Sequence, residues 1–172
     1  MARRYLINQH SPELPQRMAE RVDPELRGAI LEPLLSAWYP EACLQQFMRA
    51  FDELVTHGDR RRLIAAFEEC TLEGVNRFFH ALLQLTAPDF LLRRTPVLWN
   101  FVRRNQGSLT VETDANRAIV RYLDFPYFDD VRYRLLALGT LRPLATLCGG
   151  TNPTAEEVGY GRDWLTVEVR YR

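Results

Sequence analysis

The sequence predicts an α+β fold in which N-terminal helices pack with a four-stranded antiparallel sheet, made of two hairpins separated by one long helix. Three observations support this fold class. Apolar residues recur at helical spacing through much of residues 12–105. Two pairs of alternating segments, at 109–122 and 153–172, each surround a short polar turn. The run between them, 130–150, again has helical spacing and ends at two glycines.

The first forty residues contain several prolines and few long apolar runs. "RRYLIN" is expected to be a short strand or an ordered tail, and residues 11–28 a weakly helical lead-in. Pro33 interrupts the apolar run 29–40, which argues against a straight helix through its middle.

The clearest helix is predicted to begin at Pro40 and to stop at Gly58. Its apolar residues fall on one face, as expected for a helix that packs on a core: Leu44, Phe47, Met48, Phe51, Leu54 and Val55. Asp59 is expected to cap a following helix, and Thr71 to open another.

Two short helices are then predicted, one opened by Pro88 and the next by the pair Thr95-Pro96. On this interpretation Arg93-Arg94 and Arg103-Arg104 complete the last turns, where positive charge stabilises the negative end of the helix dipole. Gly107 would be the helix-exit glycine. A weak anion site at Arg103 and Arg104 is the alternative.

The two hairpins are predicted from the alternation of apolar and polar residues along the chain. With Ala115 and Asn116 at the turn, Leu109 faces Tyr122 and Val111 faces Val120, giving one apolar and one charged side. A second hairpin turns around Gly161-Arg162-Asp163, with a register that is ambiguous by one residue. In its last strand the buried residues are expected to be Leu165, Val167, Val169 and Tyr171.

The amino-acid composition limits the classes of function that the protein can have. The 172 residues are 47% hydrophobic, enough for one domain over 1–172, with a helical part at about 12–105 and a hairpin–helix–hairpin part at about 107–172. The 22 basic residues, all arginine, balance 22 acidic ones, which disfavours nucleic-acid binding. No apolar run suits a membrane span or a signal peptide, so we expect no membrane partner and a cytoplasmic location. The three cysteines are expected to be buried free thiols.

Catalytic and metal signatures are missing from the sequence. His10, His57 and His80 are widely scattered, and adjacent acidic pairs such as Glu68-Glu69 point in different directions. There is no G-x-G-x-x-G, Walker loop or G-x-S-x-G. We therefore predict no catalytic residue, no metal site, no cofactor and no enzymatic activity.

Three stretches carry a resemblance to a known family. "AWYPEACLQQFMRAFDEL", "RFFHALLQLTAPDFLLRRTPVLWNFVRRNQGSLTVE" and "LGTLRPLATLCGG", with a closing "VEVRY", resemble an uncharacterised family best known from myxobacteria. In element order the chain is also distantly similar to heme–nitric-oxide-binding (H-NOX) domains, vinyl-reductase-like small-ligand domains and TRAPP vesicle-tethering subunits. These resemblances imply a ligand-binding or scaffold module that is often dimeric.

The heme domains place a proximal histidine on a helix before the sheet and hold the propionates with a Tyr-x-Ser-x-Arg motif. Here His80 is the only histidine near that place, and no such motif follows it.

The leading hypothesis is a non-enzymatic bacterial regulatory or signalling module that binds a small apolar ligand or a protein partner. A dimerisation or scaffold domain without ligand is the alternative, and an enzyme of unrecognised type the next. The pocket candidates are Trp38, Phe79, His80, Trp99 and Tyr122.

Overall fold

The structure, a computed structural model, describes residues 2–34, 37–83, 87–104 and 106–172, and within the helix that ends at Leu83 it describes side chains as far as residue 74. The chain divides into two compact units, Met1–Leu63 and Ile64–Arg172, and each is described on its own. The organisation of the chain as a single domain stays a prediction.

The first unit is helical. It contains α1 (Ala2–Gln9), α2 (Leu14–Ala19), the 3-10 turn η1 (Pro24–Leu26), α3 (Arg27–Leu31), α4 (Glu41–Phe51) and the π-helical turn η2 (Asp52–Thr56). The expectation of a strand or tail at "RRYLIN" was wrong, because this segment is α1 and buries Tyr5 and Leu6. α3 ends two residues before Pro33, as the proline requires.

The helix predicted from Pro40 to Gly58 is present as α4 and η2. Met48 and Phe51 of the predicted apolar face are buried. The last five residues widen to a π-turn, after which His57 takes a left-handed conformation with φ 54° and Gly58 one with φ 79°. A glycine at the second of these positions avoids the steric cost of a side chain there.

α5 (Arg60–Leu83) is one continuous helix, and the unit boundary falls inside it. Asp59 caps it as predicted, since its carboxylate accepts hydrogen bonds from the backbone N–H groups of Arg61 and Arg62 at 2.9 and 3.2 Å. The prediction that Thr71 opens a new helix was wrong. The Thr71 hydroxyl donates to the Phe67 carbonyl at 2.8 Å, so it is satisfied within the helix.

α6 (Pro88–Val102) begins at Pro88 as predicted but does not break at Thr95-Pro96. Pro96 has no N–H for the Leu92 carbonyl four residues earlier. The buried Thr95 hydroxyl donates to that carbonyl at 2.7 Å and so replaces the missing bond. Arg93 and Arg94 therefore lie in the middle of a helix, and the prediction that they end one was wrong.

The second unit contains one four-stranded antiparallel sheet of order β1-β2-β4-β3, formed by β1 (Ser108–Asp114), β2 (Arg117–Leu123), β3 (Thr154–Tyr160) and β4 (Leu165–Arg170). The predicted pairing of Leu109 with Tyr122 and of Val111 with Val120 is confirmed. The ambiguity of the second hairpin has a structural cause, because a register shift between Glu157 and Gly159 interrupts its alternation.

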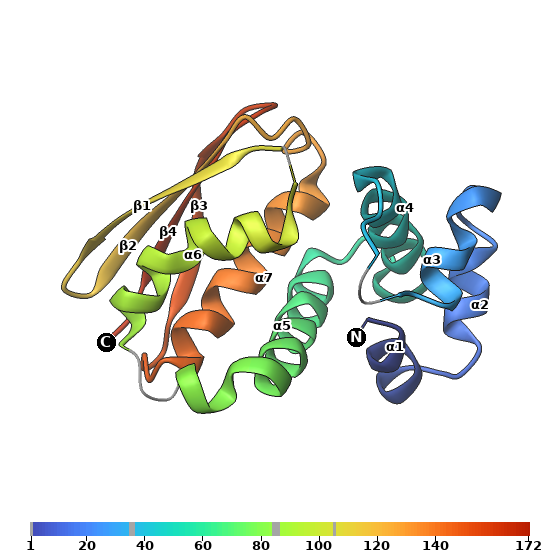
Figure 1. Cartoon of the computed structure of the whole chain (residues 1–172), viewed down its shortest axis with the longest axis horizontal. Coiled ribbons are helices and arrows are strands. Elements are labelled where there is room, and N and C mark those ends of the chain that lie inside the picture. Colours follow the sequence, from blue (N-terminus) through green and yellow to red (C-terminus); the bar gives the residue numbers. More distant parts are fainter. Residues whose placement is uncertain (1, 35–36, 84–86, 105) are drawn as a thin grey trace. The chain divides into compact units, whose positions relative to one another are not determined.

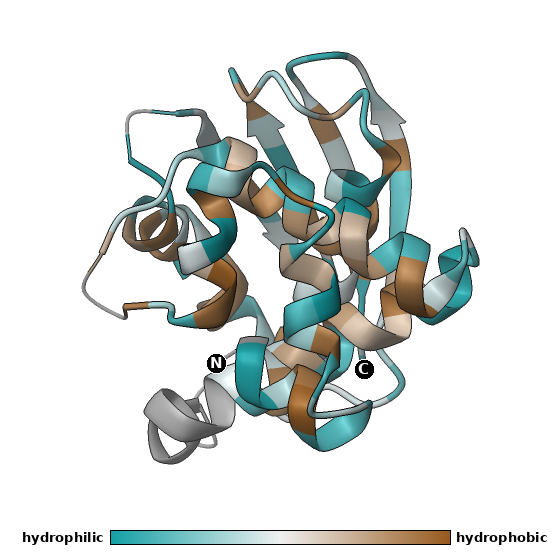
Figure 2. Ribbon diagram, turned by 90° about the vertical axis from the view of Figure 1, so that its right-hand side faces the viewer, coloured by the Kyte–Doolittle hydropathy of each residue, from teal (hydrophilic) through white to brown (hydrophobic). Residues whose placement is uncertain are grey.

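α6 and α7 (Val131–Leu147) cover one face of this sheet (Figure 1). α6 contacts β1 and α7, and α7 contacts β3 and β4. The strands alternate between hydrophobic and hydrophilic residues (Figure 2). The side chains under the helices form the core: Leu109, Ala118, Val120, Tyr122, Leu165, Val167 and Val169, together with Tyr171 beyond β4. The fold class predicted from the sequence is thus confirmed.

α5 and α7 cross closely at Gly139. A Cβ atom there would lie 2.6 Å from the Phe67 Cβ and 3.1 Å from the Ile64 carbonyl oxygen. Among the helices in the described ranges, none has a stretch apolar enough and long enough to cross a bilayer.

Candidate functional site

Two of the predicted pocket residues, Trp99 of α6 and Tyr122 of β2, meet in the second unit. Their rings pack edge to face with centroids 5.4 Å apart. Phe125, in the loop after β2, packs against Trp99 at 5.2 Å, also edge to face. Tyr122 and Phe125 are almost fully buried, whereas Trp99 is partly exposed. We call Trp99, Tyr122 and Phe125 the aromatic cluster.

Arg103 covers the aromatic cluster. Its guanidinium carbon lies 5.3 Å from the Trp99 ring centroid and 5.7 Å from that of Phe125, within the range of cation–π attraction. The same side chain donates from Nη1 to the Val102 carbonyl at 3.0 Å, at the end of α6. Arg103 therefore combines the predicted helix-end contact with a second role over the aromatic rings.

Hydrogen bonds at the end of α6 fix the positions of Trp99 and Arg103. The Arg103 N–H donates to the Trp99 carbonyl at 2.8 Å, and the backbone then becomes extended. The Trp99 indole N–H donates to the Gln106 carbonyl at 3.1 Å, which ties the ring to the exit loop. Gly107 has φ 68°, and a Cβ there would lie 2.9 Å from the Phe125 Cβ, so only glycine lets this loop pass the cluster.

The loop between β2 and α7 is held from two sides. The Phe125 and Phe128 N–H groups donate to the Asp163 and Arg162 carbonyls at 3.0 and 3.1 Å. Phe128 packs against Tyr122 and Phe125, with ring centroids 5.6 and 5.4 Å away. The loop thus fixes the inner side of the aromatic cluster.

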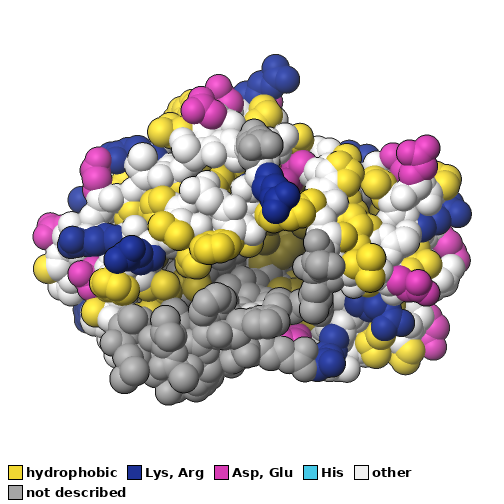
Figure 3. Space-filling view, in the orientation of Figure 1, with side chains coloured by type: hydrophobic (Ala, Val, Ile, Leu, Met, Phe, Trp, Pro, Cys, Tyr) yellow, Lys and Arg dark blue, Asp and Glu magenta, His cyan; other side chains and the backbone are white. Residues whose placement is uncertain are grey.

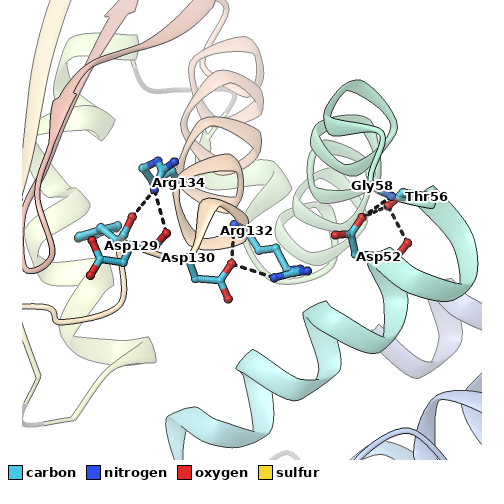
Figure 4. A network of polar contacts seen from close by, with 8 residues as sticks. Asp52, Thr56, Gly58, Asp129, Asp130, Arg132 and Arg134 are labelled. Atoms are coloured by element: carbon cyan, nitrogen blue, oxygen red, sulfur yellow. Dashed lines mark hydrogen bonds and ion pairs between the residues drawn. The ribbon is translucent and has the colours of Figure 1, made fainter.

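Arg134 of α7 holds the other end of that loop (Figure 4). This buried side chain donates to the Phe128 and Asp129 carbonyls and forms an ion pair with Glu157 at 3.0 Å. Its guanidinium also stacks on the Tyr160 ring at 3.7 Å. Because an unpaired buried charge is costly, these contacts make Arg134 a positioning residue for the loop.

Burial controls the electrostatics of the site. It raises the pKa of the Tyr122 hydroxyl, and the nearby positive charge of Arg103 only partly opposes this rise. The phenol therefore stays protonated at neutral pH and is a neutral hydrogen-bonding group. The arrangement offers aromatic edges and faces together with a positive planar group. It suits a flat apolar molecule with a carbonyl or anionic substituent better than acid–base chemistry.

A second polar network, in the first unit, serves the end of α4 (Figure 4). The buried Asp52 carboxylate accepts from the Thr56 hydroxyl at 2.5 Å and from the Gly58 N–H at 3.1 Å. These bonds close the turn that contains the left-handed His57. Within the ranges that the structure covers, no group of three or more His, Cys, Asp or Glu residues could hold a metal ion.

The remaining predicted pocket residues are Trp38, Phe79 and His80. Trp38 belongs to the first unit, where its side chain is 48% exposed. The side chains of Phe79 and His80 lie outside the described residues. Arg104 follows Arg103 after the end of α6 and is exposed.

Sequence reasoning missed Phe125 and Arg134 as parts of the site. The run "DFPYFDDVRYR" has a high density of aromatic residues for a turn, and that density is the signal that could have pointed to Phe125. Nothing in the local sequence marks Arg134, because its partners Glu157 and Tyr160 lie more than twenty residues away.

Solved structures resemble this fold closely, although their sequences are distant. An Fe(II) unliganded H-NOX protein from K. algicida matches with a TM-score of 0.70 and 12% identity, over 99% of this chain and 92% of that chain. An oxygen complex of an H-NOX domain related to soluble guanylate cyclases matches with a TM-score of 0.61 and 12% identity, over 92% and 91%. No protein-family model and no curated protein matches the sequence. The chain therefore has an H-NOX-like fold.

Among the described residues, the aromatic cluster does not have the groups expected for an iron–histidine heme site. α6, the helix that leads into β1, contains no histidine. β2 continues into "LDFPYF" without the Tyr-x-Ser-x-Arg motif. Arg103 is the arginine that covers the aromatic cluster, and it comes from the end of α6. The described side chains of the cluster are thus aromatic and cationic and include no histidine.

Proposed function

We propose that this chain is a non-enzymatic bacterial sensor module of H-NOX-like fold that binds a small, largely apolar ligand without an iron–histidine bond. The observation that carries the proposal is the aromatic cluster covered by Arg103 at the end of α6. This site belongs to a fold whose solved examples include an oxygen-binding domain.

The chemistry of the cluster defines the ligand class. Trp99 is its partly exposed ring, and Tyr122 lies behind it as a neutral phenol. A planar ligand would pack on Trp99, and a carbonyl or carboxylate group on it would accept from the Arg103 guanidinium. In this proposal Arg103 and Trp99 are the binding residues, and Arg104 is the exposed neighbour that follows Arg103 in the chain.

The state of the cysteines supports a proposal for the compartment of the protein. Cys43 and Cys148 are buried and Cys70 half-buried, all three as free thiols, which suits a reducing compartment such as the cytoplasm.

We also propose that the two compact units act as a single domain. Membership of the uncharacterised myxobacterial family stays a prediction.

Native mass spectrometry tests the ligand, with Arg103→Gln as the site variant and Arg104→Gln as its matched control. We expect the purified wild-type protein to carry an extra organic mass, or to gain one from a panel of flat aromatic carboxylic acids. Arg103→Gln should lose that mass and Arg104→Gln should keep it. Equal retention by both variants would contradict the site.

Absorption spectroscopy of the same sample tests the exclusion of heme. We expect a colourless protein, because α6, the helix before the sheet, contains no histidine. A Soret band that disappears in His80→Ala would show an iron–histidine heme and overturn the proposed ligand class.

A second candidate function, binding of a protein partner, is favoured by a different observation. α6 exposes large apolar side chains on the side opposite its buried residues, with Phe101 73% exposed. This surface is independent of the aromatic cluster.

A further inference from the structure

One side of α6 carries an exposed apolar stripe. Phe90, Val97 and Phe101 are 50%, 48% and 73% exposed. Their spacings of seven and four residues place them within a narrow sector of the helix, and Arg94 falls in the same sector. We call Phe90, Arg94, Val97 and Phe101 the α6 stripe.

The stripe differs from scattered exposed hydrophobic residues. The opposite side of the same helix buries Leu91, Leu92 and Thr95, so α6 is apolar on both sides. The stripe spans twelve residues, from Phe90 to Phe101, which corresponds to about 16 Å or three helical turns. A contiguous exposed apolar surface of this kind is typical of interaction sites.

The charge around the stripe has one dominant sign. Within α6 the charged residues are two arginines, Arg93 and Arg94, and a single acid, Asp89, and Arg104 follows the end of the helix. Arg93 forms an ion pair with Asp89 at 3.8 Å, and the Arg94 guanidinium lies over the Phe90 ring at 5.3 Å. In Figure 3, arginine and hydrophobic side chains are interspersed over the part of the view that α6 occupies.

We propose that the α6 stripe binds an acidic amphipathic helix of a partner protein. Apolar side chains of that helix would pack between Phe90, Val97 and Phe101, and its flanking carboxylates would meet the arginines. A second copy of this chain fits less well, since two basic stripes would face each other with like charge. An anionic membrane fits less well too, because three large apolar side chains give little insertion area.

A designed peptide provides the probe. The peptide is helical, ~18 residues or about five turns long, with leucines on one face and glutamates beside them. Its binding to the full chain is measured by fluorescence anisotropy. The matched probe has lysine in place of each glutamate. The stripe variant is Phe101→Ser, and the control Val158→Ser changes another exposed apolar residue, 61% exposed on β3.

We expect saturable binding of the acidic peptide that weakens as salt rises. Phe101→Ser should weaken it about tenfold, the loss expected when one large side chain is no longer buried. Val158→Ser should leave it unchanged. Arg94→Glu should weaken binding of the acidic peptide, whereas Arg162→Glu, in the β3–β4 turn, should not.

Three outcomes would overturn the proposal. The first is equal affinity for the acidic and the lysine peptide, or equal affinity of Phe101→Ser and wild type. The second is a dimer of the chain alone, seen by analytical ultracentrifugation and lost in Phe101→Ser. The third is binding to phosphatidylglycerol vesicles that depends on Phe101. Because Arg103→Gln leaves the stripe intact, failure of the ligand site would not change the peptide result.

Discussion

Gly139 is a residue of the second unit that leaves no room for a side chain. A Cβ atom there would lie 2.6 Å from the Phe67 Cβ, a distance that neither side chain can relieve by rotating. We expect Gly139→Ala to separate α5 from α7 and to lower the free energy of unfolding by ~1–3 kcal/mol or more, as overpacking does. Urea denaturation followed by circular dichroism measures this change.

Gly28 is the matched control for that substitution. It also lies in a helix, α3, but a Cβ there would meet no atom within 4 Å. Gly28→Ala should therefore leave stability unchanged or raise it by ~0.4–1 kcal/mol, by reducing the entropy of the unfolded chain. If both variants changed stability equally, the close crossing at Gly139 would be wrong.

Folding should make the Cys70 thiol much less reactive than it is in the unfolded chain. Burial, and then the charges of Glu73 and Glu69, raise its pKa from an ordinary value of 9.0 to about 12. At pH 9 about one folded thiol in a thousand would be thiolate, against about half in the unfolded chain. Iodoacetamide labelling followed by peptide mass spectrometry should thus be slow until a denaturant is added.

The same shift has a consequence for stability. A pKa raised by folding contributes stability that is present below the unfolded value of 9.0 and is lost as the pH rises toward about 12. The free energy of unfolding should accordingly fall across this alkaline range. In Cys70→Ser that part of the fall should be absent, and a curve identical to that of wild type would contradict the assignment.

At the scale of the element, α6 depends on the contact between Thr95 and Leu92. The Thr95 hydroxyl supplies the hydrogen bond that Pro96 cannot give to the Leu92 carbonyl. Thr95→Val keeps the shape but leaves this buried carbonyl without a donor, which should cost ~1–3 kcal/mol. Thermal and urea unfolding of the variant measure the loss.

A double-mutant cycle separates this mechanism from ordinary packing. Pro96→Ala restores an N–H that can reach the Leu92 carbonyl, so Thr95→Val should cost much less in that background. Additive effects of the two substitutions would mean that the hydroxyl has no special role. Circular dichroism of all four proteins should show an intact helix in each.

The elements also differ in how far the sequence predicts them. The first hairpin was predictable residue by residue, because strand alternation has a period of two and Ala115-Asn116 leaves one register with an apolar side. Thr71 and Thr95 misled the prediction, since a threonine within a helix and a threonine at a cap have the same local sequence. The hydroxyl contacts that decide between them are visible only in the structure.

At the scale of the whole molecule, the candidate site was only partly predictable. Trp99 and Tyr122 were identified because bulky aromatic residues at helix and strand positions stand out in a sequence. Trp99 contacts Phe125 only because the loop after β2 brings it there, and Arg103 lies over the rings because of the loop at Gly107. Such contacts between distant segments leave no periodic signal in the sequence.

The charge of the whole chain leads to the last prediction. Equal numbers of acidic and basic residues give no net charge, so few counterions would be released on a polyanion. We expect negligible binding to heparin or duplex DNA at physiological salt, for the wild type and for Arg103→Ala/Arg104→Ala alike. Heparin chromatography and DNA titration check this.

Arg103 and Arg104 can still be tested as a local anion site in the same pair of proteins. If they complete the end of α6 and bind no free inorganic anion, the double substitution should lower stability by ~1–2 kcal/mol through the lost helix-dipole interactions. Phosphate should then shift the melting temperature of both proteins equally. A saturable phosphate stabilisation of the wild type, lost in the double variant, would instead follow from binding by mass action. Because Arg103 donates to the Val102 carbonyl at the helix end, we expect the first result.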